Sequence, residues 1–98
     1  MNIKKNLEGQ TLLIAVEGRL DTLTAPELDG EIQGKLNDVT ELVFDFQNLD
    51  YISSAGLRIL LSAQKIMNKQ GRMVIRGAKP EVKEIFEVTG FNDILTLE

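Results

Sequence analysis

The sequence contains no cysteine and no histidine among its 98 residues. Without cysteine the chain can form no disulfide, no thiolate nucleophile and no cysteine-based metal site. Without histidine it lacks the commonest general base and the commonest metal ligand in proteins. These two absences exclude the usual zinc sites and the Ser-His and Cys-His triads.

Positive charge is scarce and scattered. The chain contains eleven Lys and Arg residues against 15 Asp and Glu residues, which gives a net charge of -4. The longest basic run is the pair Lys4-Lys5, whereas non-specific binding to nucleic acid or anionic lipid needs clustered cations. No stretch approaches the length of a membrane helix, and the first residues lack the apolar region of an export signal. We therefore expect no nucleic-acid or membrane partner and a cytoplasmic location.

Apolar residues make up 43% of the chain, as in an ordinary globular domain of this size. Short apolar runs alternate with segments in which apolar residues recur every three or four positions. This pattern predicts an α/β fold in the order β-β-α-β-α-β-α-β, with a mixed sheet of four to five strands and three main helices. The expected strands are 3–7, 12–16, 42–46, 73–75 and 94–97, and the expected helices are 24–36, 54–70 and 80–89.

Helix boundaries are indicated by capping residues. Thr24 and Glu27 have the spacing of a capping box before the first helix, which we expect to contain Gly30 and Gly34. Gly71 and Gly90 are predicted to follow the ends of the second and third helices. On the second helix, four residues should be buried against the sheet: Leu57, Leu60, Leu61 and Met67.

Two loops fall at the carboxyl ends of predicted parallel strands, where α/β proteins bind ligands and partners. The first is 18–21 and the second is 50–56. Ser53 or Ser54 would cap the helix that follows, or would hold a phosphoryl group near its positive end. Asp21 is a turn residue or a partner contact. Gly56 has no helix-propensity reason to be there, which favours close packing or the approach of a partner.

Residues 48–61 resemble the signature loop and helix of STAS domains, specifically those of bacterial anti-sigma factor antagonists. Residues 18–21 resemble the Gly-x-Leu-Asp element of that family, and 71–75 and 83–91 resemble its later strand and helix. The resemblance covers almost the whole chain in the right order, which implies a single STAS domain over residues 1–98.

The family pattern around the loop is usually Asp-Ser-Ser/Thr-Gly-Leu-Gly, and its phosphorylated serine directly follows the aspartate. That position is Ser54 here. Three residues depart from the pattern: Ser53 replaces the aspartate, Ala55 the second hydroxyl residue and Arg58 the last glycine. The resemblance implies phosphorylation at Ser54 and a partner-binding surface made of Asp21, Ser53, Ser54, Ala55, Gly56 and Arg58.

What the resemblance implies is regulation by partner switching, with no catalytic residue and no cofactor. The unphosphorylated protein, a monomer or weak dimer, would bind an anti-sigma factor that is also a serine kinase, and so free a sigma factor. Phosphorylation would release it, and a serine phosphatase would restore it. The alternative is a STAS scaffold that is never phosphorylated and acts in another regulatory or transport complex. A nucleotide-binding domain is disfavoured because 18–20 does not begin a G-x-G-x-x-G loop.

Overall fold

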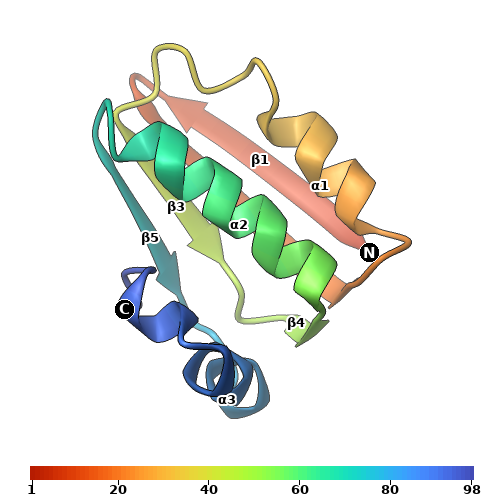
Figure 1. Ribbon diagram of the computed structural model, residues 1–98. Coiled ribbons are helices and arrows are strands. Elements are labelled where there is room, and N and C mark those ends of the chain that lie inside the picture. Colours follow the sequence, from red (N-terminus) through yellow and green to blue (C-terminus); the bar gives the residue numbers. More distant parts are fainter.

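In the computed structural model, which describes residues 1–98, five strands form one mixed sheet (Figure 1). β1 (Asn2–Glu8) pairs antiparallel with β2 (Thr11–Leu20). β2 then pairs in parallel with β3 (Glu41–Asp45), and β3 with β5 (Arg72–Arg76). β4 (Leu49–Ile52) pairs in parallel only with the end of β2. The predicted α/β fold, its mixed sheet and its N-terminal edge strand are thus confirmed.

The helices occupy two places around the sheet. α1 (Ala25–Ile32) and α2 (Ser54–Met67) lie side by side on one face, and α3 (Pro80–Thr89) packs beside β4 at one end (Figure 1). A short 3-10 helix, Phe91–Asp93, follows α3. Gly90 ends α3 in the left-handed conformation, with φ of +79°, as the sequence predicts.

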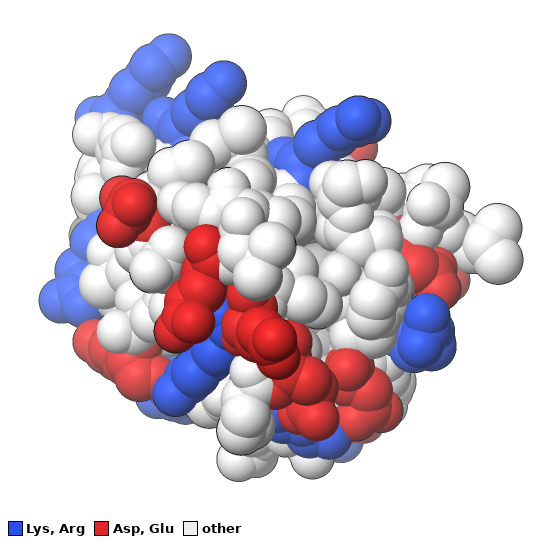
Figure 2. Space-filling model, turned by 60° about the horizontal axis from the view of Figure 1, so that its bottom comes forward, with Lys and Arg blue, Asp and Glu red and all other residues white.

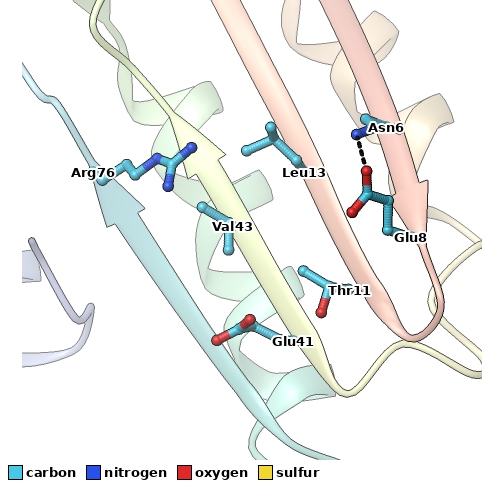
Figure 3. A pocket seen from close by; sticks show the side chains of 7 residues that line it. All are labelled: Asn6, Glu8, Thr11, Leu13, Glu41, Val43 and Arg76. Atoms are coloured by element: carbon cyan, nitrogen blue, oxygen red, sulfur yellow. Dashed lines mark hydrogen bonds between the residues drawn. The ribbon is translucent and has the colours of Figure 1, made fainter.

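The core lies between the sheet and the helices. Leu12, Ile14 and Val16 of β2 point into it, whereas the alternate residues of the strand are only half-buried on the other face. On that helix-free face, side chains of four strands surround a shallow hollow (Figure 3). Its lining residues are Asn6, Glu8, Thr11, Leu13, Glu41, Val43 and Arg76. The hollow lies away from both predicted site loops.

Two predicted strand assignments need correction. The residues Leu49–Ile52 form β4, although the sequence suggested only a loop there. Buried Leu49 and Ile52 flank exposed Asp50 and Tyr51, so four residues give neither an apolar run nor alternation. The final strand predicted over 94–97 is reduced to one bridge between Leu97 and Ile75, because the 3-10 helix uses the residues just before it.

Three details of the helices also differ from prediction. α1 ends at Ile32, so Gly34 lies beyond it, in a turn with φ of +70°. α2 ends at Met67 rather than Gln70, and Gly71 instead begins the approach to β5, tightly against the backbone of Thr40. Leu61 is only half-buried, whereas Leu57, Leu60 and Met67 are buried as expected.

Candidate functional site

The two predicted loops meet at the same end of the sheet. β2 pairs with β4 so that Leu20 lies opposite Ile52, and the backbone N–H of Ser53 donates to the carbonyl of Leu20 at 2.9 Å. Asp21 and Ser53 therefore leave the sheet from paired positions. β2 pairs with β3 as far as Ala15 and with β4 from Gly18 onward, and the register of β2 against β4 shifts between Gly18 and Arg19.

Asp21 organises the turn that leads into α1. Its carboxylate accepts hydrogen bonds from the backbone N–H groups of Leu23, at 3.0 Å, and Thr24, at 3.2 Å. The Thr24 side chain makes no capping bond to the helix; it donates to the carbonyl of Arg19 at 2.8 Å. The predicted capping box is therefore wrong. The Thr24 hydroxyl is engaged with the preceding turn instead, because it also accepts the N–H of Asp21 at 2.8 Å. Of the two roles predicted for Asp21, the turn is the one observed.

Several groups act on the ionisation of Asp21. Partial desolvation raises the pKa of its carboxyl group, but the N–H groups of Thr24 and Leu23 and the charge of Arg19 outweigh it, so that the pKa lies below its ordinary value. The Arg19 guanidinium lies 3.7 Å from the Asp21 carboxylate. It also stacks 4.4 Å from the centre of the Tyr51 ring, across the β2–β4 pair.

The lowered pKa of Asp21 predicts a specific dependence of stability on pH. The carboxylate stabilises the folded state fully above the unfolded pKa of about 3.9, and this contribution is lost as pH falls through the lower folded pKa. Asp21→Asn keeps an oxygen acceptor for the turn but does not titrate. Denaturant unfolding between pH 7 and 2 should therefore show a shallower acid loss of stability in this variant. Asp38→Asn, in an exposed loop, should follow the parent; equal slopes for all three would contradict the prediction.

The two serines at the start of α2 have opposite environments. Ser53 is the residue before the helix, and its hydroxyl oxygen is buried without a hydrogen-bond partner. Ser54 is the first helical residue and is exposed. No serine side chain caps this helix, so the capping interpretation is wrong for both residues. Ser53, extended with ψ of 176°, occupies the cap position without using its hydroxyl.

The other predicted site residues divide between surface and core. Arg58 is exposed and Ala55 is half-buried. Gly56 is buried, and a side-chain carbon added to it would lie 2.7 Å from Leu20 Cγ and 2.8 Å from Ile52 Cγ1. Close packing is thus the reason for a glycine in this helix. It fixes the first turn of α2 against the ends of β2 and β4.

Sequence reasoning missed two pairs of side chains beside the loops. One is the stack of Arg19 on Tyr51, which depends on the unpredicted strand β4. The other is an ion pair between Lys79, just before α3, and Asp50 of β4; this hydrogen bond raises the pKa of Lys79. Lys79 and Asp50 are 29 residues apart in the sequence, so no local pattern indicated their pairing. Tyr51, two residues before Ser53, was the only visible hint.

The STAS domain family model matches residues 2–98 of the chain. The protein belongs to the STAS domain family. Among curated relatives, this STAS domain is 38% identical over 85 residues to a protein named as an anti-sigma factor antagonist, BtrV of Bordetella bronchiseptica, covering 85% of this chain and 73% of BtrV. It is 27% identical to the anti-sigma-B factor antagonist of Staphylococcus aureus, covering 97% and 90% of the two chains.

The fold of this STAS domain is also that of the Bacillus protein SpoIIAA, which has been solved in unphosphorylated and phosphorylated forms. The unphosphorylated form superposes with a TM-score of 0.78 at 17% identity, over 99% of this chain and 87% of SpoIIAA. The predicted STAS family and fold are confirmed. Among its helices, none has the length and apolarity needed to span a membrane.

Proposed function

We propose that this STAS domain is an anti-sigma factor antagonist that works by partner switching, with Ser54 as its phosphorylated residue. The unphosphorylated domain binds an anti-sigma factor that is also a serine kinase, which frees a sigma factor. Phosphorylation of Ser54 releases the antagonist, and a serine phosphatase restores it. The names of the curated relatives support the antagonist role. The proposed partner surface consists of Asp21, Ser53, Ser54, Ala55, Gly56 and Arg58.

The observation that carries the choice of Ser54 is the contrast between neighbouring hydroxyl groups. A kinase needs a hydroxyl oxygen that can reach the γ-phosphate of ATP. Ser54 is exposed at the end of the sheet, whereas the Ser53 oxygen is buried. Ala55 offers no hydroxyl, so Ser54 is the only exposed serine or threonine of the loop. Ser54 also follows Ser53, whose backbone N–H is hydrogen-bonded to Leu20, the residue before Asp21.

Charge rather than refolding accounts for release in this proposal. A phosphoserine carries about -1.5 to -2 charge. It disrupts an interface where the partner surface is acidic, by repulsion, or apolar, because the phosphate loses its hydration there. The loop itself is held to the sheet through the Ser53–Leu20 hydrogen bond and the packing of Gly56. Acidic side chains already gather on the neighbouring α3 end of the molecule (Figure 2), with Glu81, Glu84 and Glu87 exposed on that helix. The phosphate adds to this negative end.

Ser54→Asp is expected to weaken binding to the kinase anti-sigma factor at least tenfold, about 1.4 kcal/mol, without changing stability. Ser54→Ala should bind like the parent and resist release by ATP, and it should lose no helix cap because the Ser54 hydroxyl caps nothing. Calorimetric titration of the host's kinase anti-sigma factor with each variant measures both effects.

Intact-mass analysis after incubation with kinase and ATP identifies the modified residue. The parent and Ser53→Ala should each gain one phosphate, and Ser54→Ala none. A phosphate on Ser53 or Thr22, or tight binding by Ser54→Asp, would overturn the assignment of Ser54. If the host kinase binds but never modifies the domain, the non-phosphorylated scaffold becomes the better description.

A further inference from the structure

Arg58 is an exposed cation that the fold leaves without a partner. None of the ion pairs and side-chain hydrogen bonds of the protein involves it, whereas Arg19, Arg72 and Lys79 all have carboxylate partners. The helix α2 contains no acidic residue over its whole length, so no carboxylate one turn away competes for the guanidinium. The neighbours at that spacing are Ser54 and Ser62.

The helix places Arg58 one turn after Ser54. Residues four apart on a helix are surface neighbours, with Cβ atoms about 5–6 Å apart. Long helical side chains lean toward the helix N-terminus, so the surface that Arg58 covers is the turn that begins with Ser54. Both residues are exposed on the same element, and neither has to leave an existing bond to meet.

We propose that Arg58 is a positioning residue that binds the phosphate of phosphorylated Ser54 within the same helix. The guanidinium offers a planar fork of N–H donors that matches two phosphate oxygens, which a point-like ammonium matches less well. The inference rests on the proposed function, because it concerns the phosphorylated form of Ser54. The usual STAS pattern has glycine at this position, whereas this chain has arginine.

The pairing gives phosphorylation two effects on the partner interface. In the unphosphorylated domain Arg58 is a free cation at the proposed partner surface. After phosphorylation its guanidinium is occupied by the phosphate and no longer available to the partner. Release therefore combines a new negative charge with the withdrawal of a positive one, and a variant without Arg58 keeps only the first effect.

The pairing can be measured without any kinase by incorporating phosphoserine at position 54 during translation. Phosphorus NMR then follows the second ionisation of the phosphate in the full chain. Arg58 should lower this pKa by about 0.2–0.4 relative to Arg58→Gln, as expected from ion pairs four residues apart. Arg58→Lys should retain only part of the shift. The Arg19–Asp21 and Lys79–Asp50 pairs at the same end of the sheet are unchanged among these proteins and cancel in the comparison.

Lys65→Gln is the matched control, because it removes an exposed cation of the same helix that lies about 16 Å along the helix axis from Ser54, beyond the screening length at physiological salt. It should leave the phosphate pKa unchanged. An unchanged pKa in Arg58→Gln, or an equal shift in Lys65→Gln, would overturn the pairing. The result is independent of whether a kinase recognises Ser54; failure of the kinase to modify the parent would count against the proposed function alone.

Discussion

Leu60→Ala is expected to lower the free energy of unfolding by about 2–5 kcal/mol, the range for truncating a fully buried leucine. Leu60 lies on the inner face of α2 and is completely buried in the core cluster between the helices and the sheet. The substitution removes apolar contacts and leaves a cavity that the strands and α1 cannot close without moving. Chemical denaturation followed by circular dichroism measures the loss.

Leu61→Ala is the natural comparison for this substitution. It removes the same atoms from the next residue of the same helix, but Leu61 is only half-buried. Its cost should be clearly smaller, because part of the truncated side chain already lies in water. Equal losses for the two variants would show that the inner face of α2 is wrongly assigned.

Gly71→Ala is expected to destabilise the protein by about 3 kcal/mol or more, at or above the upper end for overpacking. A Cβ atom at this position would lie 1.9 Å from the carbonyl oxygen of Thr40 and 2.6 Å from its carbon. That carbonyl accepts the N–H of Arg72 at 3.0 Å, while the Thr40 N–H donates to Gln10. The added methyl group would therefore clash with the backbone of Thr40, which both hydrogen bonds hold in place. The start of β5 would have to move away from its neighbours.

Gly30→Ala supplies the matched control for a glycine substitution. Gly30 is exposed within α1, and no atom lies within 4 Å of its would-be side chain. This substitution should raise stability by up to about 1 kcal/mol, because alanine favours the helix more than glycine does. Thermal unfolding of both variants separates steric conflict from propensity; similar midpoints would contradict the steric argument at Gly71.

The elements that sequence reasoning found are those with a local signal. The strand 12–16 and the second and third helices each carry an apolar run or periodicity long enough to identify them. β4 has four residues and owes its existence to pairing with the end of β2, which is about 30 positions earlier in the chain. Non-local pairing of this kind leaves almost no trace in a short segment.

The glycines show the same division. Gly90 was predicted to end a helix because its left-handed conformation is a local property of a helix end. Gly71 was misassigned because the reason for it is the backbone of Thr40, a contact that only the folded chain creates. For Gly56 the sequence indicated a close approach but not what approaches. The structure identifies Leu20 and Ile52.

The candidate site, too, could be predicted from the sequence only in part. The loops were found because strand ends attract function in α/β folds, and Ser54 followed from the family resemblance. The structure shows a difference in burial between the two serines, and that difference depends on the hydrogen bond that holds Ser53 to β2. The stack of Arg19 on Tyr51 required knowledge of β4 and was out of reach.

Because Leu20 holds the serine loop through buried atoms, the scaffold residues and the exposed residues of this edge are constrained differently. Its carbonyl binds the loop backbone and its side chain packs on Gly56, so the scaffold at this edge depends on buried atoms. The exposed side chains at 54 and 58 can then diverge without altering the backbone that presents them. Substitutions at these exposed positions can therefore change what binds at this edge while the architecture that presents it stays the same.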